Sequence, residues 1–226
     1  ADGEKFVRVT ALGGFRQVGR SCSLLHTQDS KIMIDCGVDV SSDNATPYLH
    51  LPEVLPIETI DAVIITHAHL DHSGLVPLLY KYGYDGPVYC TPPTRDMATL
   101  LQMDYLKVAA ADAKKIPYSA ENIREMIKHC IAVDYGDTTD ITPDVRLTFH
   151  NAGHILGSAI AHFHIGEGLY NIAFSGDIKY ERTWLFNPAI NRFPRLEAIF
   201  LESTYGGRED LQPSRQEATQ KLSDII

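Results

Sequence analysis

The architecture of this 226-residue chain is set by residues 62–72, Ala62-Val63-Ile64-Ile65-Thr66-His67-Ala68-His69-Leu70-Asp71-His72. Its first half is an apolar run typical of a buried strand, and its second half holds three histidines and one aspartate within six residues. His67 and His69 are two positions apart, so in extended chain both imidazoles point to one side and can hold one metal ion. Asp71 and His72 follow at the expected start of a helix, where they can face a second ion. Packing or chance is the alternative, but metal-ligand spacing explains this density better.

Three positions outside this motif are candidates for the same site. His154 lies in Gly153-His154-Ile155-Leu156-Gly157-Ser158, where flanking glycines expose the imidazole, although a structural histidine is the alternative. Asp177 ends an expected strand in Ser175-Gly176-Asp177, which suits a carboxylate that bridges two ions, the alternative being the cap of a turn. Asp35 ends another expected strand, and we predict that it orients a ligand histidine instead of binding metal.

Short β-prone runs flank a helical middle. We expect strands at residues 6–11, 21–26, 31–35, 61–66, 145–151, 159–165, 169–174 and 198–202, with a glycine turn at residues 166–168. We expect helices at residues 73–82, 94–113 and 119–131, and the start of another at residues 215–226. Pro77 favours a first helix that begins near residue 73 or later.

Composition limits the class of protein. With 44% hydrophobic and 22% charged residues, the chain is ordinary for a soluble globular protein, and no apolar run reaches the roughly 18 residues that span a bilayer. The first residues have no initiator Met and no signal pattern, so we expect a fragment. The four cysteines form no Cys-x-x-Cys pair and are predicted to be reduced, which favours the cytoplasm, although disulfides stay possible. The net charge of −9 argues against a strongly basic nucleic-acid surface, although bound cations would offset part of it.

The motifs together resemble a known superfamily. Asp35 in Ile34-Asp35-Cys36-Gly37, residues 67–72, His154 and Asp177 resemble the four ordered motifs of the metallo-β-lactamase superfamily. Residues 153–158 and Leu201-Glu202-Ser203-Thr204-Tyr205-Gly206 resemble its β-CASP nucleic-acid-processing branch, in which Glu202 matches the first extra motif. Residues 8–22, RVTALGGFRQVGRSC, are similar to archaeal relatives of the cleavage and polyadenylation specificity factor endonuclease subunit.

The resemblance implies a fold and a metal centre. The fold is α/β (α+β), a four-layer αββα sandwich that is incomplete here, with the metallo-β-lactamase domain at residues 1–206 and the start of an inserted β-CASP domain at residues 207–226. Two Zn²⁺ ions are implied, one held by His67, His69 and His154, the other by Asp71 and His72, with Asp177 between them. Asp71, Asp177 and Glu202 are the implied catalytic residues, and Glu202 would orient a distal histidine that acts as general acid.

The resemblance also implies an activity. The protein would be an endo- or exonuclease that hydrolyses single-stranded RNA and leaves a 3′-hydroxyl and a 5′-phosphate. Its role would be in mRNA 3′-end processing or transcription termination. The full-length protein would have KH domains upstream and would be a homodimer. The family's distal histidine motifs have no counterpart before Ile226, so we expect this chain to bind zinc and to cleave RNA poorly. Two alternatives stay open: another hydrolase of the superfamily, acting on a thioester or lactam, and a non-catalytic scaffold paralogue.

Overall fold

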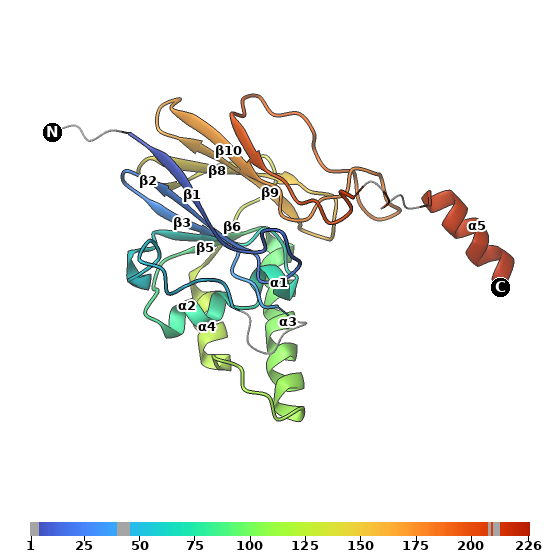
Figure 1. Cartoon of the computed structure of the whole chain (residues 1–226), viewed down its shortest axis with the longest axis horizontal. Coiled ribbons are helices and arrows are strands. Elements are labelled where there is room, and N and C mark those ends of the chain that lie inside the picture. Colours follow the sequence, from blue (N-terminus) through green and yellow to red (C-terminus); the bar gives the residue numbers. More distant parts are fainter. Residues whose placement is uncertain (1–4, 40–45, 208, 210–212) are drawn as a thin grey trace.

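The computed structural model of the chain describes residues 5–39, 46–207, 209 and 213–226. Two β-sheets lie face to face, and helices gather on the outer side of one of them (Figure 1). The first sheet has the order β1-β2-β3-β4-β5-β6, antiparallel from β1 to β3 and parallel from β3 to β6. Its strands are β1 (Val7–Gly13), β2 (Cys22–Thr27), β3 (Lys31–Ile34), β4 (Ala62–Ile64), β5 (Val88–Cys90) and β6 (Cys130–Ala132).

The second sheet has the order β11-β10-β9-β8-β7 and is antiparallel except for the β10–β11 pair. Its strands are β7 (Thr138–Thr142), β8 (Val145–Asn151), β9 (Ala159–Ile165), β10 (Tyr170–Phe174) and β11 (Ala198–Phe200). The helices are η1 (Ile57–Thr59), α1 (Leu70–Ser73), α2 (Val76–Lys81), α3 (Pro92–Ala111), α4 (Ala120–His129) and α5 (Arg215–Ile225). Residues 166–169 turn β9 into β10, as the glycines at 166 and 168 predict.

Two apolar cores hold the layers together. The inward-facing positions of β8 and β9, among them Phe149 and Phe163, are fully buried between the two sheets. Alternate residues of β9, Ala161, Phe163 and Ile165 among them, face this core because side chains along a strand repeat every two residues, and Ile160 and His162 on the other side are buried as well. The second core lies between the first sheet and helices α2 and α4, and contains Met33, Leu79 and Met126. Most of the buried apolar surface therefore lies on the two faces of the first sheet.

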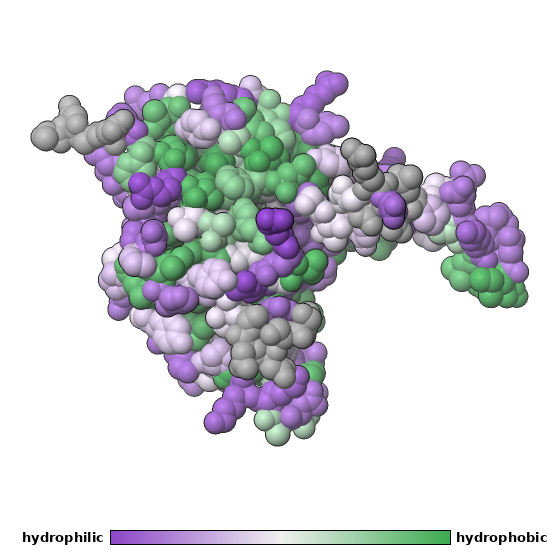
Figure 2. All heavy atoms as spheres, in the orientation of Figure 1, coloured by the Kyte–Doolittle hydropathy of each residue, from purple (hydrophilic) through white to green (hydrophobic). Residues whose placement is uncertain are grey.

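The predicted α/β fold with two facing sheets is confirmed. Three of the four implied layers are present in the described part of the chain, because no helix there covers the outer face of the second sheet. Helix α5 buries none of its residues, and its apolar side chains are open to solvent along one side (Figure 2). None of the described helices is long and apolar enough to cross a bilayer.

The expected helix at residues 73–82 is wrong in its extent, because two short helices replace it. Helix α1 already contains Asp71 and His72, and α2 begins at Val76 with Pro77 in its first turn. Pro77 has no N–H to donate to the carbonyl of Ser73, and that carbonyl instead accepts a hydrogen bond of 2.9 Å from Gln102 Nε2. Pro77 therefore causes the break between α1 and α2. Gln102 of α3 supplies the hydrogen bond that the carbonyl of Ser73 would otherwise lack.

Three short strands were not expected from the sequence. β5 and β6 have three residues each, β7 is an edge strand, and β6 occupies positions predicted as the last turn of a helix. Helix α4 ends at His129, and the next residues pair in parallel with β5. Strands this short carry little periodicity of their own, so their pairing partner decides their conformation.

Asp144 links the two sheets and is expected to make the protein sensitive to acid. It accepts hydrogen bonds from Thr27 Oγ1 at 2.6 Å, from Thr142 Oγ1 at 3.0 Å and from the hydroxyl of Ser30. Burial raises the pKa of Asp144, but the hydrogen bonds from Ser30, Thr27 and Thr142 outweigh this and lower it. A carboxyl group with a lowered pKa in the folded state stabilises the fold above its unfolded pKa of about 4, and this contribution is lost at lower pH.

We therefore expect the free energy of unfolding to fall more steeply below about pH 4 in the native chain than in the Asp144→Asn variant. Urea denaturation of both proteins between pH 3 and pH 7 measures the difference. Parallel pH profiles would show that the hydrogen bonds around Asp144 do not stabilise its ionised form.

Candidate metal centre

The candidate residues come from loops at one edge of the two sheets. Asp35 follows β3, the motif of residues 67–72 follows β4, and His154 lies between β8 and β9. Asp177 and Glu202 come shortly after β10 and β11. The sheets are joined here by a hydrogen bond of 2.8 Å from Ala159 N to the carbonyl of Thr66. Residues up to 167 positions apart in the chain, from Asp35 to Glu202, therefore reach one region.

A first group of four side chains can surround one cation. One ligand atom from each of His67, His69, His154 and Asp177 lies within 4.8 Å of the others. His154 Nε2 is 3.2 Å from His69 Nδ1 and 3.6 Å from Asp177 Oδ2, and His67 Nε2 is 3.8 Å from the same oxygen. Three imidazoles and a carboxylate are a donor set that suits Zn²⁺.

A second group shares one histidine with the first. Ligand atoms of His67, Asp71 and His72 also lie within 4.8 Å of one another. His72 Nε2 is 3.8 Å from Asp71 Oδ2 and 3.3 Å from Asp177 Oδ1. The two oxygens of Asp177 thus face different histidines, Oδ1 toward His72 and Oδ2 toward His67 and His154.

His67 provides the clearest sign that the cluster fits a metal ion. Its side chain is 1% exposed, and Nε2 is buried with no hydrogen-bond partner among the described residues. Burial and then the nearby histidines, His72 first, lower the pKa of His67 well below its usual value. The imidazole is therefore neutral, and its buried lone pair is available to a cation. A buried nitrogen without a partner is costly unless something binds it, so the residues present fit a metal.

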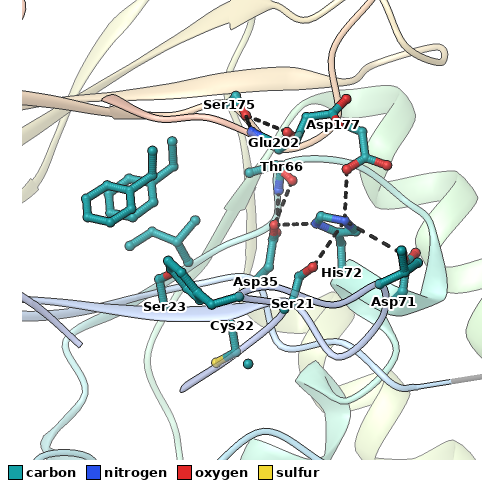
Figure 3. A pocket seen from close by; sticks show the side chains of 18 of the residues that line it. Ser21, Cys22, Ser23, Asp35, Thr66, Asp71, His72, Ser175, Asp177 and Glu202 are labelled. Atoms are coloured by element: carbon teal, nitrogen blue, oxygen red, sulfur yellow. Dashed lines mark hydrogen bonds and ion pairs between the residues drawn. The ribbon is translucent and has the colours of Figure 1, made fainter. Parts of the chain in front are cut away.

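Asp35 orients His72, and its carboxylate lies beside the imidazole ring (Figure 3). Its carboxylate is buried and accepts hydrogen bonds from Thr66 N and Thr66 Oγ1 at 2.8 Å each and from His72 Nδ1 at 2.7 Å. Burial opposes protonation of His72, but Asp35 and Asp177 outweigh it and raise the pKa of His72 to about 10. With Nδ1 bound to Asp35, Nε2 is the atom that faces Asp71 and Asp177.

Helix α1 is too short to hold its own orientation, and the segment after β3 fixes it. Cys36 N donates to the carbonyl of His72 at 2.8 Å, and Val38 N donates to that of Leu70 at 2.9 Å. Gly37 between them is required because a Cβ there would lie 1.6 Å from the carbonyl oxygen of Asp71. This backbone contact places Asp71 and His72 at the cluster.

The loop that carries His154 is held by hydroxyl groups. Ser158 is fully buried, and its Oγ accepts hydrogen bonds from His154 N at 3.1 Å and from Ile155 N at 3.2 Å. The carbonyl of Gly157 accepts from Thr91 Oγ1 at 2.7 Å and from Thr94 Oγ1 at 3.1 Å. The residues at 91 and 94 belong to the start of α3, and nothing in their local sequence indicated this contact.

We expect Ser158→Ala to loosen the His154 loop. Loss of the hydroxyl removes the acceptor of two N–H groups, which should lower the free energy of unfolding by about 1–3 kcal/mol. It should also weaken zinc binding about tenfold, as the loss of a residue that supports a ligand does. Zinc titration and urea denaturation measure the two effects, with Ser23→Ala of β2 as a control that removes another buried serine hydroxyl. Equal zinc affinity in both variants would contradict this role.

A cleft of about 580 Å³ opens beside the cluster. Its walls are the β1–β2 loop and the segments after β10 and β11, and Glu202 lies on one of them. Glu202 accepts backbone hydrogen bonds from Ile178 N at 3.2 Å and from Thr204 N at 2.9 Å. Ser21, which sequence reasoning did not single out, places its Oγ 3.3 Å from His72 Nε2 (Figure 3). The cleft gives a substrate access to Asp71 and Asp177, which are about a quarter exposed.

All eight predicted residues therefore lie in or beside one cluster. His67, His69, Asp71, His72, His154 and Asp177 form the two groups, Asp35 is hydrogen-bonded to His72, and Glu202 is in the wall of the cleft. Their assignment as ligands, bridge or catalytic groups stays a prediction. All four cysteines are free, as predicted, although Cys22 and Cys36 interact with each other, as do Cys90 and Cys130.

The chain is similar to curated archaeal proteins. The chain is 61% identical over 224 residues to the transcription termination factor FttA of Methanosarcina mazei. This match covers 99% of the chain and 35% of that protein. The FttA of Thermococcus kodakarensis is 51% identical over 230 residues, covering 98% of this chain and 36% of that protein. The chain thus spans about a third of the length of these relatives.

A crystal structure of a protein of unknown function from Enterococcus faecalis shares the fold, with a TM-score of 0.62 at 14% identity over 98% of this chain and 57% of that one. The model of the metallo-β-lactamase superfamily matches residues 16–224. As the motifs predicted, the chain belongs to the metallo-β-lactamase superfamily.

Proposed function

We propose that the chain is the metal-binding segment of a zinc-dependent ribonuclease that hydrolyses phosphodiester bonds of single-stranded RNA. The observation that carries the proposal is the pair of ligand groups that share His67 and are spanned by the two oxygens of Asp177. Superfamily membership supports a metal-dependent hydrolase. The relatives that are named transcription termination factors support RNA as the substrate, in 3′-end processing or termination.

Each residue has a defined part in this proposal. His67, His69 and His154 would hold one zinc ion, Asp71 and His72 would hold the other, and Asp177 would contribute its carboxylate to both groups. Two zinc ions would activate water near neutral pH and offset the negative charge that develops on the phosphoryl oxygens, so that the products are a 3′-hydroxyl and a 5′-phosphate. Asp35 keeps Nε2 of His72 directed at the cluster through its hydrogen bond to Nδ1.

The remaining parts of the proposal concern the longer protein. Residues 1–206 are assigned to the metallo-β-lactamase domain and residues 207–226 to the start of an inserted β-CASP domain, in which Glu202 would orient a distal histidine. The full-length protein is proposed to be a cytoplasmic homodimer. The free cysteines support a reducing compartment.

Elemental analysis combined with a cleavage assay tests the proposal. We expect two zinc ions per chain, and slow cleavage of end-labelled single-stranded RNA by an excess of the chain, lost on chelation and restored by zinc. The downstream product should carry a 5′-phosphate. Hydrolysis of a chromogenic lactam or of a glutathione thioester with RNA left intact would favour another hydrolase of the superfamily. A purified chain that takes up no zinc would favour a scaffold role.

A further inference from the structure

The segment after Asp177 presents large apolar side chains at the tip of a closed turn. Thr183 N donates to the carbonyl of Phe186 at 3.0 Å, and Phe186 N donates to Thr183 Oγ1 at 2.9 Å. Between them, Trp184 is 79% exposed and Leu185 is 83% exposed. Trp184 is the only tryptophan of the chain. Indole rings are normally covered in folded proteins, so a ring held outward by a closed turn indicates a binding surface.

This turn is fixed relative to the metal cluster. Lys179 N donates to the carbonyl of Ala152 at 2.9 Å, and Ala189 N donates to the carbonyl of Lys179 at 2.7 Å. The packing is so close that a Cβ on Gly153 would lie 2.6 Å from the carbonyl oxygen of Lys179. Gly153 directly precedes His154, and Lys179 comes two residues after Asp177. The base of the turn therefore rests on the two loops that supply these candidate ligands.

The charge of the segment differs from that of the chain. Residues 178–197 contain four basic and two acidic residues, whereas the whole chain has a net charge of −9. Lys179 forms an ion pair of 3.5 Å with Glu181, Arg195 forms one with Glu197, and Arg182 has no ion pair with any described residue. Tyr180, which is 54% exposed, adds a second aromatic ring next to these cations. Exposed aromatic rings interleaved with basic groups are the pattern that binds single-stranded nucleic acid.

We propose that residues 179–186 form a stacking platform that holds single-stranded RNA beside the metal cluster. Trp184 and Tyr180 stack on bases, and Arg182 contacts the phosphate backbone. Stacking is tolerant of base identity because every base has an aromatic face, so this platform holds the strand without selecting its sequence. In a chain with a net charge of −9, Arg182 would supply a cation for the phosphate backbone that no described acidic residue neutralises. The inference rests on the proposed RNA substrate.

Fluorescence of the single tryptophan tests the inference directly. Stopped-flow mixing of the zinc-loaded full chain with a short single-stranded RNA should quench Trp184 emission before cleavage occurs. Trp184→Ala should raise the dissociation constant, measured with fluorescein-labelled RNA, by about 5- to 150-fold, and Trp184→Phe should restore part of the affinity. Arg182→Ala should reduce the slope of log Kd against log salt concentration by about 0.7. Tyr82→Ala, which removes an aromatic ring that is 52% exposed at the end of α2, should leave the affinity unchanged.

The possible results separate the two proposals. Quenching by RNA without any cleavage would contradict the ribonuclease activity and support the platform. Cleavage of RNA with no change in Trp184 emission, and with native affinity in Trp184→Ala, would overturn the platform alone. Emission that changes only with protein concentration would show that the turn contacts a second copy of the chain, and would also overturn it. Thermal denaturation of Trp184→Ala, expected to match the native chain, shows that the exposed ring is not needed for folding.

Discussion

Replacement of His69 by alanine (His69→Ala) should raise the dissociation constant for zinc by about two to three orders of magnitude. Four-ligand zinc sites bind with roughly 10–16 kcal/mol, so one ligand contributes about 2.5–4 kcal/mol. His69 is suited to the test because it is only partly buried, with its Nδ1 3.2 Å from His154 Nε2, and is not part of an apolar core. Zinc competition with a chromogenic chelator measures the change.

The matched control is His129→Ala, which removes a histidine from α4, outside both ligand groups. It should bind zinc as the native chain does. If the native chain cleaves RNA, the cleavage rate of His69→Ala should be reduced by at least the same factor as its zinc occupancy. Unchanged zinc affinity in His69→Ala would remove His69 from the ligand set and require the first group to be reassigned.

Asp35→Ala should be the most destabilising substitution at the site. It would leave Thr66 N, the Thr66 hydroxyl and protonated His72 Nδ1 buried without their shared acceptor. Removal of one partner from a buried charged pair costs about 3–5 kcal/mol, and the left-handed φ of +58° at Asp35 adds strain for alanine. Zinc affinity should fall by about 10- to 100-fold, because His72 loses the group that orients it.

Asp35→Asn separates the contributions of charge and of backbone. Asparagine tolerates the left-handed region and keeps one oxygen acceptor. The free energy of unfolding of Asp35→Asn should therefore lie between that of the native chain and that of Asp35→Ala. Urea denaturation gives the free energies of unfolding, with Asp137→Ala on an exposed turn as a control that removes a carboxylate without a loss of stability. A loss below 1 kcal/mol in Asp35→Ala would mean that water replaces the carboxylate at His72.

Local patterns were sufficient for the elements and ligand types that depend on neighbouring residues. Residues 62–72 show a buried strand and then closely spaced ligands, and the β-prone run at residues 159–165 forms β9 as predicted. Local patterns failed where a residue far away in the sequence decides the local conformation or hydrogen bonding. Pro77 indicated a helix boundary, but only Gln102, from α3, shows how the freed carbonyl of Ser73 is satisfied. The three-residue strands β5 and β6 likewise depend on each other for their conformation.

The sequence by itself determined the superfamily, the α/β class and the identity of the candidate metal residues, because ligand chemistry and strand periodicity are encoded within a few neighbouring positions. Only the tertiary structure decided that His67 belongs to both ligand groups, that the two oxygens of Asp177 face different histidines, and that Ser158 and Gly37 hold the loops in place. These contacts join residues that are far apart in the chain. They exist because the packing of two sheets brings the ends of β3, β4, β8, β10 and β11 to one edge.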